Sequence, residues 1–241
     1  ISAGDSSNTI IDGGGVSSVI YINPQSATID TTTLIQGFKI TNGGNFENGS
    51  GLHINNSGII LNGMFLNNNQ GVSLYVSNSD KTIIENSSIN GNSGGYEWNS
   101  ILFAIYFEDN ESIIIRNSSI KNNSGGGYIK NTSSLSIYNT SYEYNLFPLN
   151  VNNCSDLEIS YCTINYNQNA EGDGGGLVCS NSTGKLNNSY INYNTVNGNS
   201  SGGTRKGGGA YLSGSIQVIN CEVKGNKLTT SGASQGHGGG Y

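Results

Sequence analysis

The sequence predicts an all-β fold: a single-stranded right-handed parallel β-helix of about eight coils, each 22–32 residues long. The first observation is a motif that recurs seven times: Asn, two residues, an apolar residue, two residues, Asn. The second is that apolar positions within a unit lie two or five residues apart, which is typical of strands with a corner and not of helices. The third is composition, because 36 Gly and 38 Asn among 241 residues favour turns over helices.

Four columns define the repeat, with an eighth, weaker copy around Ile40. The apolar column consists of Phe65, Ile89, Ile120, Tyr142, Ile164, Ile191 and Val223. Three residues later each coil closes on Asn68, Asn92, Asn123, Asn145, Asn167, Asn194 and Asn226. Five residues before the apolar column the chain is always aliphatic, and two residues before it the side chain is always small. We expect each coil to contain three short strands, each paired with its counterpart one coil on.

A second asparagine column precedes the apolar column by three residues, with Tyr161 as its one exception. Its members are Asn62, Asn86, Asn117, Asn139, Asn188 and Asn220. Because a buried amide is costly unless it is paired, we interpret this column as an inward ladder in which stacked amides bond from coil to coil. Tyr144, Tyr166 and Tyr193 share another column, which predicts a short aromatic stack.

The repeat covers most of the chain, so we expect one domain over residues 1–241, with a less regular segment at 1–34. Its abrupt ends suggest an excerpt of a longer chain. A net charge of −6 with only ten scattered basic residues provides no surface for nucleic acid. No apolar run of 18 residues is present, so we expect no direct membrane insertion by this segment.

Glycine clusters before several coils, "GSGLH", "GGGLV" and "GGGAY", alternate with the apolar-x-x-Asn motif. Together they resemble the GGAI and FxxN repeats of polymorphic outer-membrane proteins and of adhesin-like β-helix proteins, over roughly residues 35–241. Most FxxN positions carry Ile or Tyr instead of Phe. The resemblance implies a right-handed parallel β-helix with a secreted or surface-displayed adhesive or structural role, and it carries over no catalytic residue.

The chain contains twelve N-x-S/T sequons, a number close to what its composition gives by chance. Position distinguishes them. Five fall 10 or 11 residues before the apolar column, and we expect them to form a glycosylated row on one outer edge: Asn55, Asn110, Asn131, Asn153 and Asn181. Four further candidates are Asn187, which is expected to point outward, and Asn48, Asn122 and Asn199. The sequons at Asn86, Asn117 and Asn139 belong to the proposed inner ladder and are expected to be bare. Turn-favouring Asn-Ser/Thr pairs are the alternative interpretation.

Other candidate chemistry is sparse. Cys154 and Cys179 lie near one turn of adjacent coils and are the candidates for a disulfide. Two acidic turns could supply oxygens to calcium: one contains Glu108, Asp109 and Glu111, and the other Glu171 and Asp173. Solvated loops are the simpler interpretation of both turns, and no cofactor is expected. His237, in a Gly-His-Gly, follows Arg205 and Lys206 but lacks the paired aspartates that pectin-hydrolysing β-helix enzymes place beside such residues.

These patterns favour an extracellular or cell-surface structural or adhesive rod, N-glycosylated on one edge and able to stack end to end into a filament. Its expected partners are copies of itself, glycans or cell surfaces. Two alternatives remain open. One is a polysaccharide lyase or hydrolase on the same scaffold, which requires paired carboxylates facing one sugar. The other is a non-catalytic glycan-binding module that uses exposed Tyr or Trp98 as stacking platforms.

Overall fold

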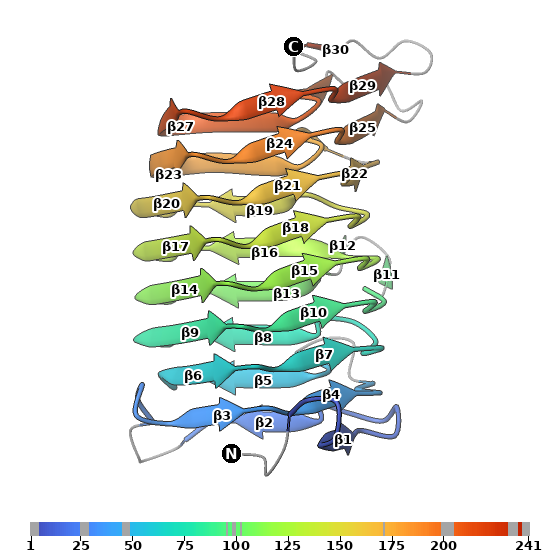
Figure 1. The fold of residues 1–241 in the computed structure, drawn as a ribbon, viewed down its shortest axis with the longest axis vertical. Helices are drawn as coiled ribbons and strands as arrows, with labels where there is room; N and C mark the ends of the chain where they lie inside the picture. Colours follow the sequence, from blue (N-terminus) through green and yellow to red (C-terminus); the bar gives the residue numbers. More distant parts are fainter. Residues whose placement is uncertain are drawn as a thin grey trace.

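The computed structural model is a rod of stacked coils whose strands pair in parallel from one coil to the next (Figure 1). It describes residues 5–24, 29–44, 49–94, 96–97, 100–101, 103–170, 172–198, 205–230 and 236–237. Sheets run the length of the rod on three faces. The predicted parallel β-helix is therefore confirmed.

Each coil contributes one strand to each face, and the first two faces belong to one sheet because β23 and β27 continue from one into the other. The first face consists of β2 (Ile20–Ile22), β5 (Leu52–Asn55), β8 (Leu74–Ser77), β13 (Phe103–Glu108), β16 (Gly126–Lys130), β19 (Leu149–Asn152) and the first halves of β23 (Leu177–Asn187) and β27 (Ala210–Ile219). The second face consists of β3 (Leu34–Gln36), β6 (Ile59–Asn62), β9 (Lys81–Glu85), β14 (Ser112–Arg116), β17 (Ser134–Tyr138), β20 (Asp156–Ser160) and the second halves of β23 and β27.

The third face is a nine-stranded sheet, one strand more than the eight coils expected. Its strands are β1 (Ile10–Asp12), β4 (Lys39–Thr41), β7 (Phe65–Asn67), β10 (Ser88–Asn90), β15 (Ser119–Lys121), β18 (Ser141–Glu143), β21 (Thr163–Asn165), β24 (Tyr190–Asn192) and β28 (Glu222–Lys224). The additional coil lies within the segment expected to be less regular. Three smaller sheets complete the described structure. A three-stranded sheet consists of β22 (Gln168–Asn169), β25 (Thr195–Gly198) and β29 (Lys227–Thr230), and β26 (Arg205–Lys206) pairs with β30 (Gly236–His237). In one insertion β11 (Tyr96–Glu97) and β12 (Ser100–Ile101) form an antiparallel pair.

The chain turns at three corners, and every non-glycine residue with positive φ lies at one of them. The first corner, between the first and second faces, has Asn56, Asn78, Asp109, Asn131, Asn153 and Asn181 in the left-handed region. The second corner, between the second and third faces, has Asn86, Asn117, Asn139, Tyr161, Asn188 and Asn220, with Gly37 and Gly63 in the early coils. The third corner, after the third face, has Asn42, Asn68, Asn122, Tyr144, Tyr166 and Tyr193, with Gly91 and Gly225. Asparagine tolerates this conformation better than most residues, which explains much of its abundance.

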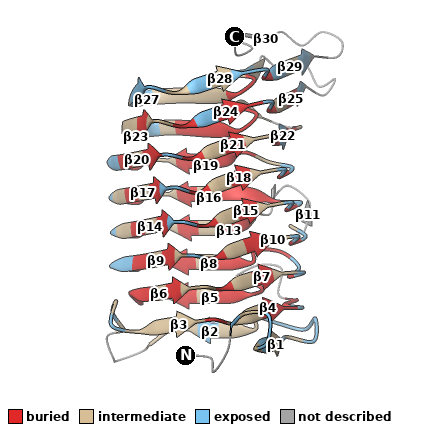
Figure 2. Cartoon of the chain, viewed as in Figure 1, coloured by how far each residue is buried: buried red, intermediate tan, exposed pale blue. Residues whose placement is uncertain are grey.

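Stacked aliphatic side chains fill the interior, as the predicted columns require (Figure 2). Leu61, Ile84 and Ile115 pair in register on the second face, and Leu66, Ile89 and Ile120 on the third. Burying one such side chain contributes about 1.5–3 kcal/mol, so a continuous column is a large stabilising term.

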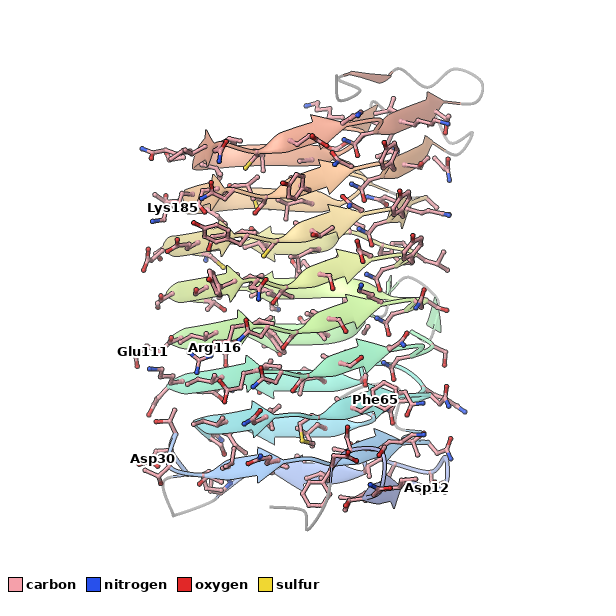
Figure 3. The ribbon with its side chains drawn as sticks, viewed as in Figure 1. Asp12, Asp30, Phe65, Glu111, Arg116 and Lys185 are labelled. Carbon is pink, nitrogen blue, oxygen red and sulfur yellow. The ribbon has the colours of Figure 1, made fainter. Side chains whose placement is uncertain are left out.

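The predicted register is wrong by one residue in the coil around β7. Leu66, not Phe65, pairs with Ile89 and is buried, while Phe65 lies outside with the Lys39 ammonium 5.8 Å from its ring centroid (Figure 3). The run of three asparagines at 67–69 fits either register in the sequence. Burying Leu66 selects one of them, because a one-residue shift moves every side chain of a strand to the opposite side.

Candidate functional site

The buried polar ladder of the rod is the closing asparagine column that follows the third corner. Its members are Asn69, Asn92, Asn123, Asn145, Asn167, Asn194 and Asn226. The Asn123 side chain shows the pattern: its Nδ2 donates to Oδ1 of Asn145 at 2.9 Å and to the carbonyl oxygen of Ile89 at 3.1 Å. Its own Oδ1 accepts from the backbone N–H and Nδ2 of Asn92. Each buried amide is thus satisfied by its neighbours, which removes the penalty for burying it.

The second-corner column, predicted to be that inner ladder, lies at the surface instead. Asn86, Asn117, Asn139 and Asn220 are exposed, and Asn62 is not a member, because Gly63 holds the corner position in its coil. The side chains bond only along the surface, for example from Nδ2 of Asn139 to Oδ1 of Asn117 at 2.8 Å. With positive φ the corner residue turns its side chain outward, and the small residue after it points inward. The argument that these sequons are bare because they are buried is therefore wrong.

Three of the five sequons predicted to share one edge do so. Asn131, Asn153 and Asn181 are exposed at the first corner on successive coils. Asn110 departs from the row: it is 2% exposed, and its Oδ1 accepts the Ser79 backbone N–H. Asn55 also departs, half-buried at the end of β5. At those coils the corner position belongs to the neighbouring residues Asn56 and Asp109, a shift that the sequence spacing did not resolve.

The remaining sequon candidates divide three ways. Asn122 is exposed at the third corner, and its Nδ2 donates to Oδ1 of Asn90. Asn187 is only half-exposed, and its Oδ1 is buried without a hydrogen-bond partner. Its side chain is therefore less accessible for N-glycosylation than predicted. Asn48 and Asn199 lie outside the described residues. Whether any of these asparagines carries a sugar stays a prediction.

A groove of about 620 Å³ runs along the rod at the second corner. One wall consists of the corner residues Asn86, Asn117, Asn139 and Tyr161. The hydroxyl-bearing residues that follow them, Ser87, Ser118 and Thr140, form the bottom. The other wall consists of the residues at the start of the third-face strands, Ser88, Ser119, Ser141 and Thr163. Among the residues that the structure describes, no charged side chain lines it. Charged side chains on the flanking strands form ion pairs, Arg116 with Glu85 and Lys121 with Glu143, each with an N–O distance of 2.6 Å. The groove is therefore polar and locally neutral, and it lacks the paired carboxylates of a glycosidase.

An aromatic column, not foreseen from the sequence, covers the first face. Tyr21, His53, Tyr75, Tyr106 and Tyr128 follow one another with ring centroids 4.7–5.6 Å apart. Adjacent rings contact one another along the rod axis, so the column stabilises the stacking of coils. Aligning the first-face strands by their Asn and Asp corner residues would have revealed it.

Glu108 is the electrostatic centre of that column. Its carboxylate accepts hydrogen bonds from the hydroxyls of Tyr75 and Tyr106 and pairs with Lys130 at 2.8 Å. Burial raises its pKa, but the bonds from Lys130 and Tyr75 outweigh burial and hold the pKa of Glu108 below its usual value. Burial and the bond to Glu108 raise the pKa of Tyr75 to about 12. A carboxylate with three donors is held in its charged form and makes a poor proton donor at neutral pH.

The described acidic side chains of the two candidate calcium turns have other contacts or face solvent. Asp109 accepts a hydrogen bond from Nδ2 of Asn131, Glu111 is exposed, and Asp173 accepts the Lys206 backbone N–H, while Glu171 and Trp98 lie outside the described residues. Within the part of the chain that the structure describes, no three His, Cys, Asp or Glu side chains lie close enough together to hold a metal ion. Strand pairing sets the backbone of Lys206 beside that of His237.

The predicted disulfide is not formed. Cys154 and Cys179 are both free and buried, as is Cys162. Burial raises the pKa of the Cys162 thiol to about 11, and burial together with the nearby Cys154 raises that of Cys179 to about 12. Such thiols are largely protonated and unreactive at neutral pH. Cys154 and Cys162 follow corner residues, at interior positions that carry serine or threonine on neighbouring coils, while Cys179 pairs in register with Val151 and Leu212 in an aliphatic column. The tyrosine stack is confirmed, with Tyr166 centred 4.9 Å from Tyr144 and 5.2 Å from Tyr193.

Comparison with known families agrees with this architecture. The model of the right-handed β-helix region matches residues 50–228. The chain belongs to the right-handed β-helix family. Searches of curated proteins and of solved structures found no match. Because enzymes and non-enzymes both belong to this β-helix family, membership shows the scaffold and not the activity. Among the described residues no helix is long and apolar enough to span a membrane.

Proposed function

We propose that this β-helix is an extracellular or cell-surface structural and adhesive rod that is N-glycosylated along its first corner. The observation that carries the proposal is the row of exposed sequons at Asn131, Asn153 and Asn181 on a continuous rod. The Glu108 cluster is saturated by its own partners, and the groove at the second corner is lined without charge. Both features favour a non-catalytic role over a polysaccharide-degrading one.

The stacking of the coils limits how many of these sites can be used together. Neighbouring coils are about 4.8 Å apart, and Nδ2 of Asn153 lies 2.8 Å from Oδ1 of Asn131. An N-linked glycan is wider than that spacing. We therefore expect Asn131 and Asn153 to be modified on different molecules, and Asn131 with Asn181 to be the favoured pair.

Intact glycopeptide mass spectrometry of the chain secreted from a eukaryotic host tests the proposal. The expected result is sugar at the first corner, with single and alternate occupancy and no molecule modified at both Asn131 and Asn153. Replacing Ser133 with Ala removes the Asn131 sequon and should raise occupancy at Asn153. An unmodified first corner, or modification mainly at the buried Asn110, would contradict the proposal.

End-to-end association is a second part of the proposal. Within the described residues, β1 and β28 each have a strand neighbour on one side only in the third-face sheet. An unpaired strand edge accepts another strand readily. Electron microscopy of concentrated protein should show rods longer than one chain. A monodisperse monomer at high concentration, measured by light scattering, would count against filament formation.

A further inference from the structure

We infer that the second-corner groove binds an extended, uncharged β-1,4-linked glycan along the rod axis. This inference goes beyond the structural role and does not depend on glycosylation of the first corner. It requires the corner asparagines in the groove to be bare.

The first support is the set of open hydrogen-bonding groups that face the groove. Oδ1 of Asn139 and the hydroxyls of Ser141 and Thr163 have no side-chain partner among the described residues, and Nδ2 of Asn117 donates to none. By contrast the bottom hydroxyls are satisfied, because those of Ser118 and Thr140 donate to backbone carbonyls at 2.8 and 2.9 Å. On the other wall the Ser119 hydroxyl donates to that of Ser88 at 3.2 Å. The groups left open in the groove therefore include both donors and acceptors. Such groups match the hydroxyls of a sugar, each of which both donates and accepts.

The second support is the repeat. A hydroxyl recurs on all four coils of the groove and a corner amide on three of them, about 4.8 Å apart along the rod. A pyranose unit of an extended β-1,4-linked chain advances by nearly the same length, so the sugars keep step with the coils. Because neighbouring sugars of such a chain are turned relative to one another, each sugar meets its coil through the opposite edge from the sugar before it. Ser88, Ser119, Ser141 and Thr163 span four coils. Affinity should therefore rise with chain length and level off at about four to five sugar units.

The third support is Tyr161, the one residue that interrupts the asparagine column. It lies at the end of the groove, 56% exposed, with its ring centroid 5.5 Å from that of Tyr138. An exposed ring beside hydroxyl groups offers an apolar face to a sugar ring and a polar tip to its hydroxyls. The uncharged lining and paired neighbouring charges favour a neutral glycan over an acidic one.

Isothermal titration calorimetry on the chain produced without N-glycans tests the inference. The probes are the hexasaccharides of cellulose, xylan, mannan and chitin, their shorter homologues, and hexagalacturonate as the acidic comparison. At least one neutral series should bind, with affinity rising up to the tetramer or pentamer. Absence of binding by all four neutral series at millimolar concentration, or tighter binding of hexagalacturonate, would overturn the inference.

Two matched variants locate the site. Tyr161→Asn restores the residue found at this corner on neighbouring coils, so the fold is kept, and it should weaken binding about tenfold through loss of the ring contact. Tyr166→Asn removes a tyrosine that is 42% exposed at the third corner, outside the groove, and should leave affinity unchanged. Equal affinities for Tyr161→Asn and the unmodified chain, or equal losses in the two variants, would place binding elsewhere. Circular dichroism of both variants confirms that each is folded.

Discussion

The second corner and the position directly after the third corner both carry asparagine on most coils, yet their side chains face opposite ways. After the third corner each side chain enters the core and bonds with its counterparts above and below, as Asn123 does with Asn92 and Asn145. At the second corner Asn117 and Asn139 turn outward and bond along the surface. Asparagine thus has two separate uses: its amide satisfies buried polar groups, and its tolerance of positive φ allows a tight turn. The following predictions test that difference.

The largest effect is expected from the buried column. Asn145→Ala removes Oδ1, which accepts from the backbone N–H and Nδ2 of Asn123. It also removes Nδ2, which donates to the Ile120 carbonyl oxygen and to Oδ1 of Asn167. Leaving such groups unpaired should lower the free energy of unfolding by about 3 kcal/mol, measured by urea denaturation. The control is Asn139→Gly at the second corner, where the loss should stay below about 0.5 kcal/mol. Similar losses in the two variants would remove the distinction between the columns.

A smaller effect is expected when the backbone role of the second corner is removed. Asn117 has φ of 50°, which a β-branched side chain disfavours. Asn117→Val should therefore cost about 1–2 kcal/mol of unfolding free energy. Asn117→Gly keeps the conformation accessible and should be nearly neutral. A neutral Asn117→Val variant would show that backbone conformation is not what selects asparagine here.

The tyrosines of the third corner test a third use of a corner position. Tyr166→Asn keeps a residue suited to positive φ but removes two stacked ring contacts, with Tyr144 and Tyr193. We expect a loss of about 1 kcal/mol in thermal or urea unfolding. Tyr161→Asn, which loses a single edge-to-face contact with Tyr138, should cost less. The reverse order would mean that ring stacking does not stabilise the corner.

The smallest effect concerns pH, because neither asparagine column titrates. The pKa of Tyr75 is raised to about 12 when folded, against about 10 in an unfolded chain. The folded state therefore holds this proton more tightly, and stability is lost as pH rises above about 10. Tyr75→Phe cannot lose a proton, so its unfolding free energy should fall less steeply from about pH 10 to 12. Parallel pH profiles for the two proteins would contradict this role of Tyr75.

Most of the fold could be predicted because a solenoid repeats one local pattern. Alternation of Ile113 and Ile115, or of Leu135 and Ile137, indicates strands directly, and equal positions on successive coils must stack. The register of the repeat columns failed in the coil around β7, at residues 60–69, where three consecutive asparagines allow two alignments of nearly equal quality. The sequon row failed at Asn110 for the same reason: an error of one residue exchanges inside for outside.

The candidate sites were less predictable. Tyr161 was visible in the sequence only as an exception to a column, and its place at the end of the groove depends on how the second and third faces meet. The Glu108, Tyr75 and Lys130 cluster joins residues from three coils, with sequence separations that differ because the loops between coils differ in length. No single repeat unit contains that information.

By itself, the sequence determined the parallel β-helix, the columns of the core and the coils on which asparagine recurs, because these follow from periodicity. The tertiary structure decided which asparagine column is buried. The reason is geometric: at these corners a residue with φ near 50° turns its side chain to solvent, and the side chain of the following residue points inward. The spacing of residues along the chain is the same whichever of the two columns faces the core, so only the fold of the corners distinguishes them.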